Sequence, residues 1–375
     1  MSHLSLTFSI ADQDFDRTKS IGILNVSLRL LEHLAKNPGV DRIAVLANSG
    51  LERLVPQDGK VVLHRHDGPN ATRLRRIFWD QIQVYRVAKQ LGNPWLFLPK
   101  GFASFLRKPP VRLITYVHDV IPQYYEEKYP EAVSPLERWY FRASLDSTLR
   151  HSTIVFTNSE FTKSEIARLA EVRGIPAPPI VAAGIGFCWT AGFEATRRED
   201  ILVLSSRLPH KRTDLAMDYL SRWQQETGYS GAVHWIGPLP RNIQPSAFPN
   251  WRFHLRVPEV EYRSLMAGAR VLVYFTEYEG FGMPPVEALA AGLCPVFSRV
   301  PATNEVMRGA GRSFENHSYS GFAQAMTEAL TTPPDLIRQW TDLMRDAHDW
   351  RKVTDRMVAA LAALELRWQK GAKPH

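Results

Sequence analysis

Cysteine is scarce in this sequence of 375 residues, and long apolar runs are absent. The two cysteines, Cys188 and Cys294, lie far apart, so neither a disulfide framework nor a cysteine zinc site is indicated. No apolar run approaches the ~20 residues of a membrane-spanning helix. The first residues, MSHLSLTFSI, lack the basic and apolar regions of a signal peptide. We therefore expect a protein of the reducing cytoplasm.

The charge balance identifies no partner by itself. Lys and Arg number 46 against 38 Asp and Glu, and a net charge of +8 suits nucleic acid, an anionic lipid surface or a phosphorylated ligand. Neither a Walker A motif nor G-x-G-x-x-G occurs, so nucleoside triphosphatases and dinucleotide enzymes lack their phosphate loops here. With 45% hydrophobic residues, the composition is that of a folded enzyme.

Short apolar runs alternate with longer amphipathic segments along the chain, which predicts an α/β fold with parallel sheets. The alternation starts at the N-terminus and again near Ile201, and a stretch rich in Pro and Gly lies between. We place the domain boundary between Gly184 and Thr196. Ligands are expected at the carboxyl ends of the strands, in a cleft between two domains. The predicted segments are a domain over 1–185, a domain over 186–352 and a closing helix over 353–375 that packs across both.

The stretch VLVYFTEYEGFGMPPVEALAAG predicts a ligand site at a strand end. A buried strand ends at Phe275, and Gly280 and Gly282 let the following loop approach a ligand closely. The start of the next helix offers unpaired N–H groups that suit an anion. Glu279 and Glu287 flank the same volume, and carboxylates accept paired hydrogen bonds from vicinal sugar hydroxyls. Taken alone, the pattern also fits a junction whose glutamates complement a helix dipole.

A second strand–loop–helix junction, ILVLSSRLPHKRTDLAMDYL, contains two cations in its loop. Arg207 and Lys211 lie four residues apart, ahead of a helix that Thr213 or Asp214 would cap. Arginine grips phosphate with two hydrogen bonds and lysine acts as a compact charge, so the pair can hold a nucleotide diphosphate. A solvated basic turn is the other interpretation.

Two features of the N-terminal half also suggest binding. In LITYVHDVIPQYY, His118 follows a strand and can donate a hydrogen bond to a sugar hydroxyl while Asp119 orients its ring; a purely structural histidine is the alternative. Residues 72–91, TRLRRIFWDQIQVYRVAKQL, combine basic and aromatic residues around an apolar stripe. Such a helix can lie on an anionic membrane, or it can pack on the domain with a basic outer face.

The two glutamates of EGFGMPPVEALAAG, with seven residues between them, resemble the motif of retaining glycosyltransferases of family 4. These enzymes have the GT-B fold, two facing Rossmann-like domains with a cleft between them. The basic loop resembles the Arg and Lys pair that binds the donor diphosphate. His118 and Asp119, followed by Pro122, resemble the pattern of mannosyltransferase-like members. The resemblance implies that the N-terminal domain binds the acceptor and the C-terminal domain the nucleotide sugar.

The resemblance also implies a role for each site residue. Arg207 and Lys211 would stabilise the leaving diphosphate, Glu279 would hold the transferred sugar, Glu287 the ribose, and His118 the sugar or the acceptor. The acceptor-side candidates are Asp119 and Ser159, of which Ser159 is also a predicted helix cap. The other donor-binding candidates are Gly22, just before a helix, Val257, Gly280, Phe281, Gly282 and Met283.

No cofactor and no metal are expected. Asp12-Gln13-Asp14 spells the Asp-x-Asp of GT-A glycosyltransferases, but it lies at the end of the first strand without that family's context.

The reaction implied is retaining hexose transfer, with GDP-mannose favoured and UDP-hexose or dTDP-rhamnose open. The acceptor would be a saccharide, such as a lipid-linked oligosaccharide of a surface polysaccharide. The enzyme would act in the cytoplasm, on the inner face of the inner membrane if residues 72–91 bind lipid. An epimerase or phosphorylase of the same fold is disfavoured by the glutamate motif. The alternative of another class is a non-enzymatic basic protein that binds nucleic acid or another polyanion, although no nucleic-acid module is recognised.

Overall fold

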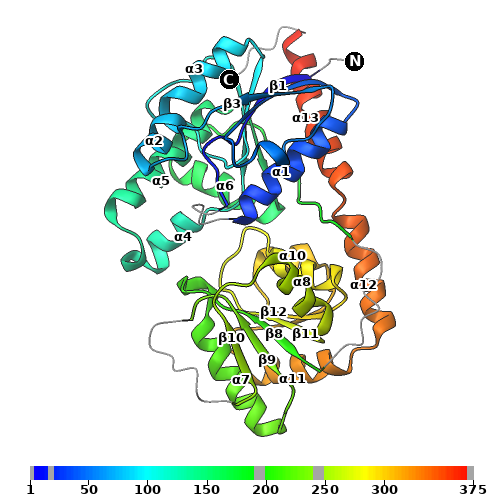
Figure 1. The fold of residues 1–375 in the computed structure, drawn as a ribbon. Helices are drawn as coiled ribbons and strands as arrows, with labels where there is room; N and C mark the ends of the chain where they lie inside the picture. Colours follow the sequence, from blue (N-terminus) through cyan, green and yellow to red (C-terminus); the bar gives the residue numbers. More distant parts are fainter. Residues whose placement is uncertain (1–3, 16–20, 190–198, 240–248, 370–375) are drawn as a thin grey trace. The chain divides into compact units, whose positions relative to one another are not determined.

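The computed structural model describes residues 4–15, 21–189, 199–239 and 249–369, which form two compact units. The first unit is Met1–Gly186 with His348–His375, and the second is Phe187–Ala347. Of the predicted connection between Gly184 and Thr196, residues 190–196 lie outside the described residues. Each unit contains one parallel sheet with helices, so the predicted α/β class is confirmed (Figure 1).

The sheet of the first unit has seven strands in the order β3-β2-β1-β4-β5-β6-β7. Strand β4 is a buried apolar run and β6 is buried throughout, as expected where helices cover both faces of a parallel sheet. The strand order reverses between β1 and β4, and ligands in such sheets bind outside the carboxyl ends of the strands at that point. The strands are β1 Leu4–Ser9, β2 Val40–Ala47, β3 Val61–Arg65, β4 Trp95–Leu98, β5 Arg112–Val117, β6 Ile154–Thr157 and β7 Ile180–Ala182.

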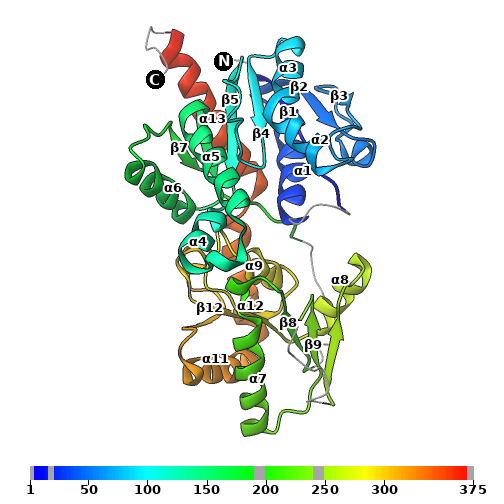
Figure 2. The same ribbon diagram turned by 90° about the vertical axis from the view of Figure 1, so that its left-hand side faces the viewer.

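The helices of the first unit lie on both sides of its sheet, with α2, α3 and α5 on one side and α1 and α13 on the other (Figures 1 and 2). The closing helix α13 packs on α1, and Arg356 on it donates a hydrogen bond of 3.0 Å to the carbonyl of Ala183. The helix expected over 72–91 is present, interrupted by one π-helical segment. The elements are α1 Ile21–Lys36, η1 Glu52–Leu54, α2 Arg73–Phe78, π-helix η2 Trp79–Gln83, α3 Val84–Leu91, α4 Ile121–Lys128, η3 Pro130–Ala132, α5 Pro135–His151, α6 Glu160–Val172 and α13 Trp350–Gln369.

The sheet of the second unit has six strands in the order β10-β9-β8-β11-β12-β13, and its order reverses between β8 and β11. Its strands are β8 Ile201–Leu204, β9 Val233–Ile236, β10 Trp251–His254, β11 Val271–Tyr274, β12 Cys294–Ser298 and β13 Arg312–Phe314. Its helices are η4 Pro209–Lys211, α7 Thr213–Thr227, α8 Glu259–Gly268, α9 Met283–Ala290, α10 Pro301–Met307, α11 Tyr319–Thr331 and α12 Pro334–Ala347.

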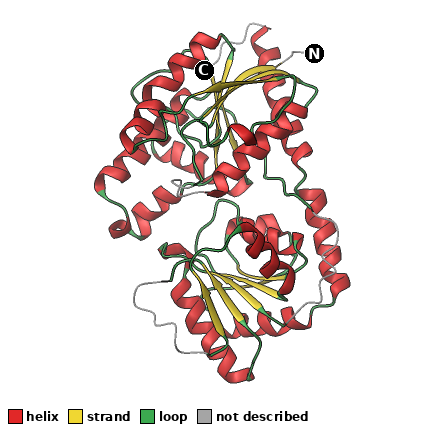
Figure 3. Ribbon diagram, in the orientation of Figure 1, coloured by secondary structure: helices red, strands yellow, loops and turns green. Residues whose placement is uncertain are grey.

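Two packed layers hold the second sheet in place (Figure 3). On one face Tyr219 of α7 and Phe322 of α11 pack around Phe275, with ring centroids 6.0 and 5.3 Å from it. In the other layer Met266 of α8 and Ala288 of α9 share a buried cluster with the strands. This packing fixes the directions in which the loops after β8 and β11 leave the sheet.

Candidate active site

The loops after β8 and β11 meet where the second sheet reverses its strand order. The loop after β8 folds into η4, which ends at Lys211, and the loop after β11 contains Glu279. The backbone N–H of Glu277 donates a hydrogen bond of 2.7 Å to the carbonyl of His210, which ties the two loops together. Two motifs that are far apart in the sequence therefore form one site.

Lys211 and Glu279 are in direct contact in this site. The Lys211 ammonium also donates a hydrogen bond of 2.6 Å to the Tyr274 hydroxyl, which in turn donates one of 2.5 Å to Glu279 Oε1. Thr276 donates to the same carboxylate oxygen at 3.0 Å. The carboxylate thus accepts from three side chains, and its orientation is fixed.

Electrostatics keep this network charged at neutral pH. Burial alone would raise the pKa of Glu279, but the charge of Lys211 and the hydrogen bonds from Lys211 and Tyr274 outweigh it and lower the pKa. Burial and the negative charges of Glu279 and Glu287 raise the pKa of Tyr274 well above its ordinary value. Tyr274 therefore stays protonated as a donor. Glu287 lies on α9, the helix that follows the same loop.

Gly282 provides the backbone geometry at the start of α9. Its φ is 84°, and a Cβ there would lie 2.6 Å from Cγ2 of Thr303, so only glycine fits without rearrangement. Pro284 and Pro285 follow in the first helical turn and carry no N–H. An anion at this helix start would therefore meet the backbone N–H groups of Gly282 and Met283.

The remaining donor-side candidates are placed differently. Phe281 is buried and stacks on Phe187 at 6.0 Å, so its side chain belongs to the core and only its backbone can face a ligand. Arg207 is exposed, and its Nε donates at 3.3 Å to the carbonyl of Leu239. The structure thus brings Lys211 to Glu279 and leaves Arg207 extended at the surface. Val257 lies half-buried between β10 and α8.

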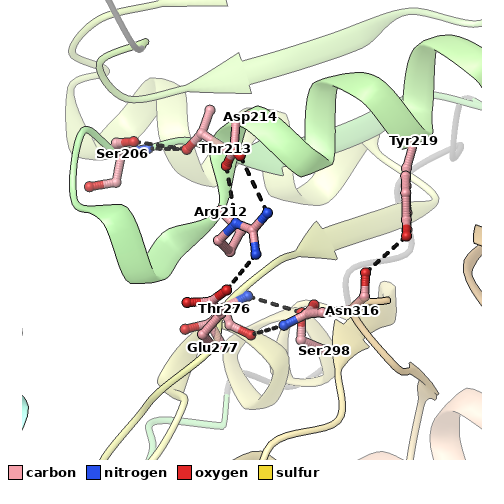
Figure 4. A network of polar contacts seen from close by, with 9 residues as sticks. All are labelled: Ser206, Arg212, Thr213, Asp214, Tyr219, Thr276, Glu277, Ser298 and Asn316. Carbon is pink, nitrogen blue, oxygen red and sulfur yellow. Dashed lines mark hydrogen bonds and ion pairs between the residues drawn. The ribbon is translucent and has the colours of Figure 1, made fainter. Parts of the chain in front are cut away.

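Arg212 was given no role by the sequence, yet it links the two loops (Figure 4). Its guanidinium contacts Glu277, and its Nε and Nη2 reach Asp214 at 3.3 and 3.4 Å. It precedes α7 with a φ of 42°, a left-handed conformation that is rare outside glycine. The sequence predicts that Thr213 or Asp214 caps this helix, and that prediction is wrong. Thr213 Oγ1 is hydrogen-bonded to Ser206 instead, and no side chain caps α7.

A second polar network holds the loop after β11 against β12 (Figure 4). The N–H of Thr276 donates to Ser298 Oγ at 3.0 Å, and Ser298 donates to Asn316 at 2.6 Å. Asn316 completes the ring by donating at 2.7 Å to the carbonyl of Thr276. Tyr219 of α7 donates to the carbonyl of Asn316 at 2.9 Å. This ring fixes the backbone from which Glu279 projects.

His118 in the first unit is a neutral histidine. Its Nε2 lies 2.8 Å from the carbonyl of Pro99, which can only accept, so Nε2 carries the proton and Nδ1 is an acceptor. Burial lowers the pKa of His118 to about 4. The Pro99 carbonyl orients the ring, whereas Asp119 accepts at 3.0 Å from the N–H of Ile121. The expected donor to a sugar is therefore better described as an acceptor through Nδ1.

Ser159 and Gly22 have local roles in the first unit. Ser159 caps α6 by accepting from the N–H of Thr162 at 3.0 Å. The sequence places Gly22 just before a helix, but α1 already begins at Ile21. Gly22 thus lies in the first turn of α1 and is exposed.

Two family models account for most of the chain. The model described as "Glycosyltransferase Family 4" matches residues 22–180, and the model described as "Glycosyl transferases group 1" matches residues 199–332. The chain belongs to glycosyltransferase family 4. It is therefore an enzyme of a retaining family, for which binding of a nucleotide-sugar donor is typical, and the non-enzymatic alternative is set aside.

Curated relatives of this glycosyltransferase act on the O-antigen chain. O-antigen chain mannosyltransferase B of Escherichia coli is 25% identical over 334 residues, which cover 77% of this chain and 82% of the relative. O-antigen chain mannosyltransferase RfbU of Salmonella typhimurium is 23% identical over 279 residues, covering 72% and 75%.

Solved structures confirm the GT-B fold. Sucrose-phosphate synthase of Thermosynechococcus elongatus aligns with a TM-score of 0.66 at 14% identity, covering 97% of this chain and 99% of its own. The α,α-trehalose-phosphate synthase of Burkholderia vietnamiensis aligns with a TM-score of 0.64 at 13% identity, covering 96% and 100%. Within the described part of the chain, no helix is both long and apolar enough to cross a bilayer.

Proposed function

We propose that this glycosyltransferase transfers mannose from GDP-mannose to a hydroxyl of a saccharide acceptor, with retention of the anomeric configuration. The ion pair between Lys211 and Glu279 carries the proposal, because it sets a cation and a carboxylate side by side at the strand ends where ligands bind. The choice of mannose is supported by the two O-antigen chain mannosyltransferases among the relatives. UDP-hexose and dTDP-rhamnose are the alternative donors.

Charge stabilisation would supply the main part of catalysis. Negative charge grows on the diphosphate as the bond to the sugar breaks, and preorganised donors stabilise such charge most effectively. Lys211 would face that charge, with Arg207 turning in from the surface and the N–H groups of Gly282 and Met283 completing the cradle. Glu279 would then bind hydroxyls of the transferred sugar. These donors are provided by the chain itself, so the proposed step needs no metal.

The remaining candidates surround that reaction. Glu287 would accept hydrogen bonds from the ribose, and residues 280–281 and Val257 would line the donor site. His118 would accept a hydrogen bond from a sugar or acceptor hydroxyl through Nδ1. We assign acceptor binding to the domain over 1–185 and donor binding to the domain over 186–352, with the helix over 353–375 closing the fold. Asp119, Ser159 and Gly22 would lie along the acceptor and phosphate path.

A donor assay tests the proposal. Purified enzyme would be incubated with GDP-mannose, UDP-glucose or dTDP-rhamnose and a lipid-linked saccharide extract, and the released nucleotide and product anomer would be measured. We expect α-linked mannose from GDP-mannose alone. Lys211→Ala and Glu287→Ala should each lose about 2 to 4 kcal/mol of transition-state stabilisation. Arg222→Ala on the exposed side of α7 is the matched control. Full activity of either site variant would refute the site.

The first unit has exposed apolar side chains that could bind the membrane in which a lipid-linked acceptor is held. Leu74 and Phe78 on α2 are 78% and 48% exposed, and Trp139 on α5 is 57% exposed. Leu106 and Arg107 are exposed in the segment that follows β4. Apolar side chains among basic ones bind anionic bilayers. We propose that this membrane surface holds the enzyme on the cytoplasmic face of the inner membrane.

Contacts within the unit join these elements into one surface. The ring of Phe105 packs edge-on against Trp139, with ring centroids 5.3 Å apart. The backbone N–H of Phe105 donates a hydrogen bond of 3.0 Å to the side chain of Gln81. Arg73 pairs with Glu137 at 3.5 Å. The segment after β4, α5 and the helix over 72–91 therefore present their exposed side chains from adjoining positions. The surface includes α5, which the sequence had not indicated.

Vesicle sedimentation tests the membrane surface. The enzyme should sediment with phosphatidylglycerol vesicles at low salt and stay in solution with phosphatidylcholine vesicles. The double variant Leu74→Ser, Phe78→Ser should bind the phosphatidylglycerol vesicles several-fold more weakly. Each substitution removes apolar area that the bilayer would otherwise bury. Val260→Ser, which removes an apolar side chain 82% exposed on α8, is the control. Protein that stays in solution with both vesicle types would refute this surface.

A further inference from the structure

The first sheet has an ion cluster at the position that corresponds to the Lys211 and Glu279 pair of the second sheet. Its strand order reverses between β1 and β4, and the residues that follow these strands include Asp12 and Lys100. The Lys100 ammonium contacts Asp12 and donates to both carboxylate oxygens of Asp80 at 2.8 and 2.9 Å. One lysine thus bridges two carboxylates at the place where α/β sheets bind ligands.

The cluster is firmly held and mostly buried. The Asp12 side chain is 3% exposed, and Asn48 fixes its loop by donating to the carbonyls of Ala11 and Gln13 at 3.0 and 2.7 Å. Asp80 belongs to the π-helix η2, a rare element that is frequent at functional sites. Two carboxylates against one ammonium leave a net negative charge, which attracts hydrogen-bond donors.

A cavity of about 270 Å³ lies beside this cluster, and Asp12 is the cluster residue that lines it. Its volume lies just below the range of about 300–1,000 Å³ that drug-sized ligands occupy, so it suits a ligand of one or two sugar rings. Both acceptors and donors line it, as hydroxyl recognition requires. Asn70 donates at 3.1 Å to Asp14 across its wall. The lining residues are Asp12, Asp14, Asn70, Ala71, Thr72, Arg73 and Arg76.

The charges of the lining favour a neutral sugar over an anion. Asp12 and Asp14 oppose Arg73 and Arg76, and Arg73 already pairs with Glu137 at 3.5 Å. A phosphate or carboxylate would meet two aspartates, whereas neighbouring hydroxyls can donate to the aspartates and accept from the arginines. A neutral sugar therefore satisfies both kinds of side chain.

We propose that this cavity binds one neutral sugar residue of the acceptor, with Asp14 and Asp12 accepting from vicinal hydroxyls and Arg76 donating to a ring substituent. The proposal rests on the proposed function, because it gives the acceptor a place in the first unit while the donor binds in the second. Asp12, Asp14 and Arg76 would then determine which sugar the enzyme extends. The Asp-x-Asp tripeptide thereby acquires a role in saccharide binding.

Saturation-transfer NMR on the full-length enzyme tests this site with methyl α-mannoside, methyl β-glucoside, methyl β-N-acetylglucosaminide and methyl β-glucuronide as probes. We expect at least one neutral glycoside to bind. Asp14→Asn and Arg76→Gln should each weaken that binding about tenfold, the effect of losing one charged hydrogen bond. Arg75→Gln, on the same helix but outside the cavity lining, should leave it unchanged. Asp12 is unsuitable for substitution because its side chain is 3% exposed and contacts Lys100, so its loss would disturb the fold of this loop.

Nucleotide binding separates the two possible failures. If GDP still raises the melting temperature of every variant but no neutral glycoside binds, or binding is the same in Asp14→Asn, Arg76→Gln and wild type, the acceptor site is wrong and the donor site stands. Preferential binding of the glucuronide would also overturn the proposal of a neutral sugar. If no nucleotide binds even the wild type, the proposed function itself fails.

Discussion

Lys211 and Glu279 form an ion pair across 68 residues of sequence, at the point where the second sheet reverses its strand order. We assign Lys211 to the diphosphate and Glu279 to the transferred sugar, two different parts of one donor. Because they neutralise each other here, donor binding must exchange this contact for contacts with the ligand. Tyr274 bonds to both and can hold each side chain in place during that exchange.

The pair should be energetically coupled. Lys211→Met leaves the buried carboxylate of Glu279 without its cation and should lower the free energy of unfolding by about 3 kcal/mol. The double variant Lys211→Met, Glu279→Gln should recover most of that loss, since the unpaired charge is gone. Urea unfolding of the single and double variants measures the coupling. A double variant no more stable than Lys211→Met would show that the pair is not coupled.

Tyr274 should act as a positioning residue. Tyr274→Phe removes the hydroxyl that bonds to Lys211 and Glu279, and we expect kcat to fall about tenfold, the value of one such hydrogen bond, with little change in KM. The pKa of Glu279 should rise, because a hydrogen bond that lowers it is lost. The acid limb of the pH–rate profile should therefore move to higher pH. Tyr319→Phe, which removes an exposed hydroxyl bonded to Glu226, is the control. An unshifted profile would contradict the role.

Arg212 should be held in its conformation by its side chain. Its φ of 42° costs about 1 to 2 kcal/mol for a residue with a Cβ and very little for glycine. Arg212→Ala loses the contacts with Glu277 and Asp214 and keeps the backbone cost, while Arg212→Gly loses both. We expect Arg212→Gly to be more stable than Arg212→Ala by about 1 kcal/mol in denaturant unfolding. The reverse order would refute the strain.

The burial of His118 should make the stability of the protein depend on pH. Because burial lowers its pKa to about 4, the unfolded chain binds a proton from about pH 6.5 downward while the folded protein does not. Its contribution is fully present above pH 6.5 and is lost as the pH falls toward 4. Between pH 7 and 5 the wild type should lose about 2 kcal/mol more than His118→Gln. Equal losses for the two proteins would contradict the neutral state.

The sequence predicted the fold and the two motifs of the donor site because both depend on local patterns. Buried strands such as VLVY and the glycine-rich loop up to Gly282 can be identified from apolar runs and turn residues alone. The meeting of Lys211 with Glu279 follows from the rule that strand ends gather at one edge of a sheet. These features need no knowledge of contacts distant in sequence.

What the sequence could not show depends on long-range packing. Tyr274 ends an apolar strand, and only the fold brings its hydroxyl to the Lys211 ammonium. Arg212 adopts a left-handed backbone that nothing in its local pattern requires. Lys100 reaches Asp12 from 88 residues away. Lys100 lies two residues beyond the end of β4, much as Arg207 lies three beyond the end of β8, but no second cation stands beside it in the loop to indicate a site.

The most direct test is thermal unfolding of wild type and Lys211→Met with GDP, UDP, dTDP and ADP, because a ligand that binds only the folded state raises its stability in proportion to RT ln(1 + [L]/Kd). We expect GDP to raise the melting temperature of the wild type more than the other nucleotides do, and to have little effect on Lys211→Met. Equal shifts in the two proteins, or no shift with any nucleotide, would contradict a donor site built on Lys211 and Glu279.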